Sequence, residues 1–212
     1  MVQIHGGGYT EGSASTVAPG DALVNASNGG LIYVQIQYRL GMWGFLGGNE
    51  IADNGVRNVG LYDQRAALNW VQRHISAFGG TLQRLQTSVT SPCLLLTSGG
   101  SAGGGSVTYQ LMAGGGYDQP PFRAAIAEYP WWQPFFNESS QEMQLFNVLN
   151  LASCNNINCL RSLPAAQLQS IHQQSYATGY GQAGAAYGVF YYGPVVDGSF
   201  LIELCHDAFK AG

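Results

Sequence analysis

The hydrophobic pattern of the chain begins with short apolar runs that have the composition of buried strands. Residues 2–4 form the first run, and residues 31–38 form a second, which is rich in β-branched and aromatic side chains and follows Gly29-Gly30. From residue 60 onward, apolar positions recur on one face of a predicted helix that ends near Gly79-Gly80. These positions are Leu61, Leu68, Val71 and Ile75. A strand, a loop and a long helix in this order predict a crossover unit of a parallel sheet.

The same alternation returns in the middle of the chain. Residues 93–97 predict a short buried strand, residues 102–112 a helix and residues 123–129 the next strand. The segment from Thr81 to Ser98 is mostly polar before Pro92 and fits this alternation least well. We therefore predict an α/β fold with a mostly parallel central sheet flanked by helices.

Two further helices are predicted over residues 139–151 and 164–175, with a loop containing two cysteines between them. Residues 176–187 are rich in glycine, alanine and tyrosine, which predicts a mobile loop. The first of the two helices carries an apolar stripe, and such a stripe usually packs in the core. The stripe consists of Met143, Phe146 and Leu149.

The charge of the chain argues against some classes of function. The formal net charge is −4, 9% of the residues are charged, and the 8 basic residues are scattered. A nucleic-acid surface or a polybasic membrane patch needs clustered lysine and arginine, so we expect neither. No apolar stretch approaches the ~18 residues of a membrane-spanning helix, so we expect no stable membrane insertion. Nothing in the sequence indicates an oligomeric state.

The strongest chemical signal is Gly99-Gly100-Ser101-Ala102-Gly103, which follows an apolar run. One serine between glycines at the G-x-S-x-G spacing is typical of a nucleophile elbow, a tight strand-to-helix turn that requires small neighbours. Ser101 is therefore the candidate nucleophile. With 30 glycines in the chain, a flexible glycine loop is the simpler interpretation. A phosphate-binding loop is disfavoured because the Lys-Ser/Thr ending is missing.

A second glycine run, His5-Gly6-Gly7-Gly8-Tyr9, follows the first predicted strand. Glycines at the end of a strand let backbone N–H groups approach an anion without obstruction from side chains. Preorganised donors of this kind stabilise the oxyanion of a tetrahedral intermediate. A plain flexible turn is the alternative, and the later G-x-S-x-G pattern makes it less attractive.

Cys154 and Cys159 are close in sequence and could form a disulfide, contribute half of a metal site, or be close by coincidence. We favour the disulfide because a zinc site needs two further ligands and His172 is the only nearby candidate. Asn25 and Asn137 begin glycosylation acceptor patterns. Together these features favour a secreted protein.

Taken in order, several motifs resemble the type-B carboxylesterase/lipase family. In its overall sequence the chain resembles the secreted fungal members of this family. The resemblance covers nearly the whole chain and implies the α/β-hydrolase fold. The motifs are residues 5–8, 38–41, 58–64, 100–104, 159–164 and 194–198.

The resemblance assigns roles to particular residues. It makes Ser101 the nucleophile and places the oxyanion hole at the N–H groups of Gly7, Gly8 and Ala102. It also implies a disulfide between Cys154 and Cys159. It implies no metal and no organic cofactor.

The resemblance also implies that residues 1–212 are one partial domain, incomplete at both ends. The family's catalytic acid and histidine come after the landmark at residues 194–198, so they are expected beyond Gly212, and the opening strands before Met1. The family has a shorter connection where Thr81 to Ser98 stand here, a departure that we attribute to a misread exon junction. Asp197 and His206 satisfy the order of a triad, but they belong to a turn landmark and a structural helix.

We expect a serine hydrolase of carboxylic esters that acts on small-molecule or lipid esters through an acyl-enzyme. The chain by itself is expected to be inactive, and the alternative is a non-catalytic binding or adhesion module on the same fold. Glu128, which ends the strand after the elbow, is expected near the site. Seven aromatic side chains could line an acyl pocket or pack in the core: Tyr9, Trp43, Phe45, Trp131, Trp132, Phe135 and Phe136.

Overall fold

The structure is a computed structural model, and it describes residues 1–80, 95–116, 118–181, 189–204, 207 and 210. The polar segment at residues 81–94, which departs from the family pattern, lies outside the described residues. So does His206.

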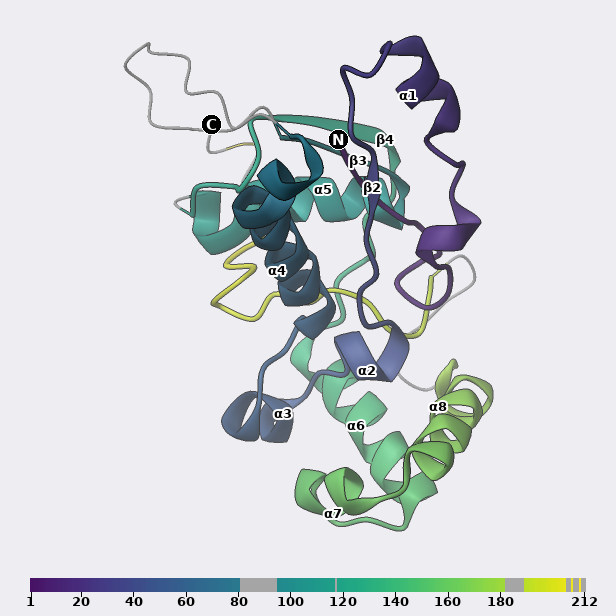
Figure 1. The fold of residues 1–212 in the computed structure, drawn as a ribbon. Coiled ribbons are helices and arrows are strands. Elements are labelled where there is room, and N and C mark those ends of the chain that lie inside the picture. Colours follow the sequence, from purple (N-terminus) through teal and green to yellow (C-terminus); the bar gives the residue numbers. More distant parts are fainter. Residues whose placement is uncertain (81–94, 117, 182–188, 205–206, 208–209, 211–212) are drawn as a thin grey trace.

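Within this part of the chain, the strands form one four-stranded parallel sheet at one end of the molecule, with the helices of residues 138–179 at the other end (Figure 1). Its strands are β1 (Val2–Ile4), β2 (Val34–Gln35), β3 (Leu96–Ser101) and β4 (Ala124–Pro130), in the spatial order β2-β1-β3-β4. The pairs β1–β2, β1–β3 and β3–β4 are all parallel. The predicted parallel α/β architecture is therefore confirmed.

The second strand is shorter than the apolar run at residues 31–38 predicted. Two residues of it, Val34 and Gln35, pair with Val2 and Gln3. The reason is geometric, because β1 is itself three residues long and offers few partners. Ile36 and Tyr38 are nevertheless buried, so the run contributes to the core as expected.

Helices connect and cover the strands. Helix α4 (Val59–His74) buries Leu61, Leu68 and Val71, as its sequence period predicts, and a short 3₁₀ helix at Ile75–Phe78 ends it. Helix α5 (Ala102–Met112) follows β3 without a loop and lies against the sheet (Figure 1). The remaining α-helices are α1 (Asp21–Ala26), α2 (Gly41–Phe45), α3 (Asn49–Asn54), α6 (Glu138–Ala152), α7 (Ile157–Ser162) and α8 (Ala165–Gly179). A further 3₁₀ helix spans Ala14–Thr16, and a turn at Ala113–Gly116, with Gly114 and Gly115 in the left-handed conformation, follows α5.

The α6 helix turns a different face to the core than its apolar stripe predicts. Met143 and Phe146 are 43% and 66% exposed, whereas Leu145 and Val148 are 3% and 1% exposed. The expected core stripe is therefore wrong at Met143 and Phe146, whereas its third residue, Leu149, is half-buried and packs against the core. The buried face also carries Gln141 and Gln144, whose amides donate to backbone carbonyls of Phe136 and Tyr191. Because these hydrogen bonds satisfy the buried amides, the two glutamines can lie on the buried face of the helix.

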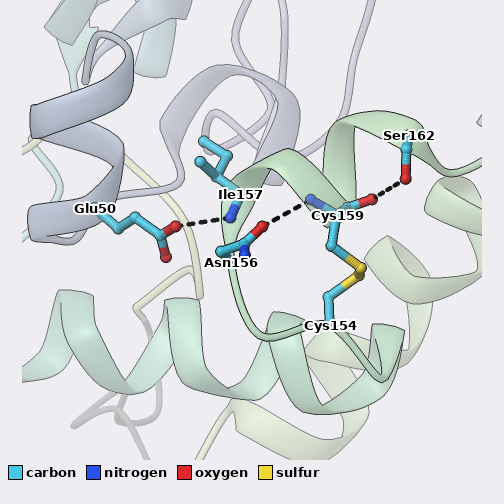
Figure 2. The surroundings of a disulfide bond; sticks show 6 residues. All are labelled: Glu50, Cys154, Asn156, Ile157, Cys159 and Ser162. Atoms are coloured by element: carbon cyan, nitrogen blue, oxygen red, sulfur yellow. Dashed lines mark hydrogen bonds between the residues drawn. A yellow bond between two sulfur atoms is a disulfide. The ribbon is translucent and has the colours of Figure 1, made fainter.

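The segment after α6 is held by the predicted disulfide between Cys154 and Cys159, whose Cα atoms are 5.6 Å apart. The loop expected between the cysteines contains the start of α7 instead (Figure 2). The Asn156 side chain accepts a hydrogen bond from the Cys159 N–H at 2.9 Å, and Glu50 of α3 accepts one from the Ile157 N–H at 2.9 Å. These two acceptors satisfy donors at a helix N-terminus, which makes so short a helix possible.

The last long helix also extends further than predicted. The expected mobile loop begins at residue 176, but α8 continues through Gly179. Tyr176 lies on this extra turn and packs edge-on against Tyr191 and Tyr192, with ring centroids 5.9 and 5.3 Å away. Aromatic packing against a later segment therefore prolongs the helix. Residues 182–188 lie outside the described residues.

The two faces of α6 yield a direct test. Leu145→Ala should lower the free energy of unfolding by about 2–5 kcal/mol, because a buried leucine leaves a cavity when it is truncated. Phe146→Ala, one position further, should change it by less than about 0.5 kcal/mol, because its ring is exposed. Urea denaturation of the two variants measures both values. Equal losses would show that the core face is assigned wrongly.

Candidate active site

Ser101 stands at a sharp junction between a strand and a helix. It is the last residue of β3 and immediately precedes α5, and its backbone has φ 56° and ψ −124°. A positive φ is costly for a residue with a side chain, on the order of 1–3 kcal/mol, and such strain concentrates at functional sites. A turn of this kind presents the serine hydroxyl at the end of the strand. The geometry is that of a nucleophile elbow.

The glycines around Ser101 are required because backbones approach each other closely. A Cβ placed on Gly104 would lie 2.6 Å from the Glu128 carbonyl oxygen of β4. A Cβ on Gly103 would collide with the Ile4 carbonyl of β1, and one on Gly105 with the Trp131 carbonyl. These contacts show that the first turn of α5 lies directly against neighbouring strand ends. The flexible-loop interpretation of the glycine run is wrong.

The first glycine run lies beside the elbow, although about 95 residues separate the two in sequence. A Cβ on Gly6 would be 2.7 Å from the Gly100 carbonyl oxygen and 3.2 Å from the Ser101 Cβ. Gly7 and Gly8 have φ of 108° and 60°, which are readily accessible to glycine. The parallel pairing of β1 with β3 explains the juxtaposition, because parallel strands end at the same edge of a sheet.

His5, which opens the first glycine run, is a structural residue of this loop. Its ring is 1% exposed and stacks on Tyr38 with ring centroids 4.4 Å apart. Its Nδ1 lies 2.8 Å from the Gly6 carbonyl oxygen, and the Tyr38 hydroxyl donates to the His5 carbonyl at 2.8 Å. Burial lowers the pKa of His5 and raises that of Tyr38, so both rings are neutral at pH 7. The pair therefore fixes the course of the glycine loop.

The structure uses Asp197 in a turn. One carboxylate oxygen accepts hydrogen bonds from the Ser199 and Leu201 N–H groups at 3.0 and 2.9 Å, and the other accepts from the Asn58 amide at 2.8 Å. These bonds agree with the expectation that Asp197 belongs to a turn landmark. No hydrogen bond connects the Ser101 hydroxyl to a histidine or a carboxylate among the described residues.

Ser101 opens into a cavity of 810 Å³. Glu128 is part of the lining, as its place at the end of β4 predicts. Glu11 and Tyr33 also line it, and the sequence reasoning missed both. Glu11 could have been found from its position three residues after Gly8, whereas nothing near Tyr33 in sequence marks it. Gly6, Gly7, Gly100 and Tyr129 are also part of the lining.

None of the seven aromatic residues considered for an acyl pocket lines this cavity within the described part of the chain. Phe190, which the sequence reasoning did not single out, instead packs its ring directly on Gly8. Trp131 meets Phe190 edge-on, with ring centroids 5.2 Å apart. Aromatic rings therefore cover the Gly8 side of the glycine loop.

The described residues contain no group of three histidine, cysteine, aspartate or glutamate side chains that could hold a metal ion. No described helix is long and apolar enough to cross a membrane.

A parallel sheet that carries a strained serine between β3 and α5 defines an α/β-hydrolase. The chain belongs to the carboxylesterase family, whose sequence model, described as "Carboxylesterase family", matches residues 1–212. Among curated relatives, carboxylesterase patB of Penicillium expansum is 36% identical over 206 residues, which cover 95% of this chain and 34% of the relative. Lipase 2 of Geotrichum candidum is 33% identical over 230 residues, covering 100% and 38% of the two chains.

Solved structures agree with this assignment. EstA of Aspergillus niger matches with a TM-score of 0.82 and 33% identity, over 100% of this chain and 39% of that one. The carboxylesterase EST55 of Geobacillus stearothermophilus matches with a TM-score of 0.76 and 27% identity. The chain thus spans little more than a third of the length of the relatives it matches, and the predicted α/β-hydrolase fold is confirmed.

The close backbone contacts of α5 predict the effect of a single methyl group. Gly103→Ala should lower the free energy of unfolding by about 1–3 kcal/mol, because its Cβ meets the Ile4 carbonyl and the His5 backbone, which cannot move freely. Gly181→Ala is the matched control, since a Cβ there meets nothing within 4 Å. Thermal and urea unfolding measure both. A loss of similar size in the control would contradict the packing explanation.

The buried His5 and the half-buried His172 predict the pH dependence of stability. Burial lowers the pKa of His5 and of His172 from the usual 6.5, and His172 packs against the neutral rings of Tyr176 and Tyr192. Below pH 6.5 the unfolded chain therefore binds more protons than the folded one, so stability falls as the pH falls. Urea unfolding between pH 7.5 and pH 5.5 should show this decline, and His172→Gln should make it shallower. An unchanged slope in the variant would exclude His172 as a cause.

Proposed function

We propose that the protein is a serine hydrolase of carboxylic esters in which Ser101 is the nucleophile. The observation that carries the proposal is the contact between the two glycine motifs, which puts Gly6 against the Ser101 Cβ. A serine at an elbow and a glycine loop that can point backbone N–H groups at an anion are the two parts that acyl transfer needs in one place. Membership of the carboxylesterase family supports the same chemistry.

The oxyanion hole is proposed at the N–H groups of Gly7, Gly8 and Ala102. Ala102 is the first residue of α5, and the first N–H groups of a helix have no intrahelical acceptor. Gly7 lines the cavity beside Ser101, and the positive φ values of both loop glycines turn the backbone sharply there. After Ser101 attacks the ester carbonyl, these donors would stabilise the negative oxygen until the alcohol leaves. Water would then release the acid from the acyl-enzyme.

A serine hydroxyl needs a general base to become a strong nucleophile. We propose that a histidine and a carboxylate from a longer protein supply it, and that residues 1–212 alone are inactive. The unpartnered Ser101 hydroxyl supports this, as does the share of the relatives' length that the chain spans. The proposed substrates are small-molecule or lipid esters, because the relatives include a carboxylesterase and a lipase by name.

We further propose that the protein is secreted and glycosylated. The disulfide between Cys154 and Cys159 supports an oxidising compartment. Asn25 and Asn137 are both exposed. The Asn137 side-chain oxygen accepts from the Ser140 N–H at 2.9 Å and caps α6, which leaves its nitrogen free for a glycan.

A non-catalytic binding module on the same fold is the competing function. Ser101 is present and is held in a strained backbone conformation, which a binding surface would not require. We therefore favour the enzyme.

A fluorophosphonate probe tests the proposal, because it modifies activated serines. In a longer protein that contains the acid and the histidine, we expect labelling that Ser101→Ala abolishes. Ser170→Ala, an exposed serine on α8, is the control and should leave labelling unchanged. Residues 1–212 alone should label on the order of 10⁴-fold more slowly, the size of effect that a single triad substitution has on turnover. Labelling that survives Ser101→Ala would overturn the assignment.

A further inference from the structure

Tyr129 is an irregular residue at the edge of the Ser101 cavity. In the pairing of β3 with β4, Gly100 pairs with Glu128, but Ser101 pairs with Pro130. Tyr129 is therefore the extra residue of a β-bulge, opposite the nucleophile itself. Its φ is 32°, a value that side-chain-bearing residues rarely adopt. Bulges next to active sites often redirect a side chain, and an observed strain of this kind points to function.

The bulge places the Tyr129 ring over the elbow. A Cβ on Gly100 would lie 2.5 Å from the Tyr129 hydroxyl oxygen and 2.7 Å from the ring carbon that carries it. Among the described residues, the atoms nearest to that position all belong to Tyr129, so its ring occupies the space that a side chain at residue 100 would need. The strained backbone of Tyr129 and the glycine at position 100 are thus linked, because the ring that the bulge places there requires a residue without a side chain.

The Tyr129 side chain is available to a ligand. It is 75% exposed and lines the 810 Å³ cavity into which Ser101 opens. Its hydroxyl makes no hydrogen bond to another residue in the described part of the chain. Within the described residues the ring therefore buries little of its surface, and their packing does not explain the strain at residue 129.

We propose that Tyr129 is a specificity-determining residue whose ring forms a wall of the substrate cleft and favours esters that carry an aromatic group. The inference rests on the proposed role of Ser101. An aromatic ring offers an exposed flat surface to a second ring, and stacked or edge-on pairs gain energy beyond the area that they bury. The bulge holds this surface beside the nucleophile, where one half of a bound ester must lie.

Matched ester pairs test the proposal in the longer protein. The pairs are phenyl acetate with ethyl acetate, and methyl benzoate with methyl propanoate, so that the ring stands on either side of the ester bond. Tyr129→Ser should lower the aromatic preference in kcat/KM of at least one pair about 3- to 10-fold. Tyr129→Phe, which keeps the ring, should retain the preference. The intrinsic reactivities of the esters cancel when variants are compared.

The contact with Gly100 gives a second test. Gly100→Ala should lower the same preference, because its methyl group displaces the Tyr129 ring. In the Tyr129→Ser background it should have no further effect, since the obstructing ring is gone. Phe146→Ser, an exposed ring on α6, is the control and should not change the preference. A preference that Tyr129→Ser leaves unchanged in both pairs would overturn the inference.

The outcomes separate this inference from the proposed function. If the fluorophosphonate probe does not label Ser101 in the longer protein, the nucleophile assignment fails and the inference with it. If labelling is normal but Tyr129→Ser leaves both preferences unchanged, only the inference fails. Equal losses for all four esters would mean that Tyr129 acts on the fold of the elbow, which also contradicts a role in specificity.

Discussion

The close approach of backbone to backbone at the carboxyl ends of β1 and β3 is the constraint on which the site depends. Gly6 lies against the Gly100 carbonyl and the Ser101 Cβ, and Gly103 lies against the Ile4 carbonyl. Side chains at these positions would separate the two motifs. The proposed nucleophile and the proposed anion-binding loop meet because glycines, which have no side chains, stand where the two backbones approach each other.

This contact also explains how strain at the elbow is tolerated. Ser101 and Tyr129 both have positive φ, at a cost of about 1–3 kcal/mol each, and they lie on adjacent paired strands. The N–H of Trp131 donates to the Ser101 carbonyl at 2.9 Å and closes the end of the pair. On the loop side, the stacked His5 and Tyr38 rings hold the neighbouring glycines. Contacts with the surrounding residues therefore offset the free-energy cost of the strained backbone.

Away from the sheet, hydrogen bonds from polar side chains stabilise the helices. Glu50 reaches from α3 to the first N–H of α7, which the disulfide between Cys154 and Cys159 ties to the end of α6 (Figure 2). Gln141 and Gln144 satisfy backbone carbonyls from the buried face of α6. This group of helices is stabilised by hydrogen bonds at helix ends as well as by its apolar contacts.

The sequence by itself determined the parallel order of strand, helix and strand, because this order depends on local periodicity. It also determined the elbow at Ser101 and the glycine loop after β1, because few backbone conformations require these residue types. The tertiary structure decided which face of α6 is buried, how far α8 extends, and that Tyr129 bulges over Gly100. Each of these depends on a partner distant in sequence or on a shift in strand pairing. A local pattern cannot record such a partner, since burial is a property of the assembled fold.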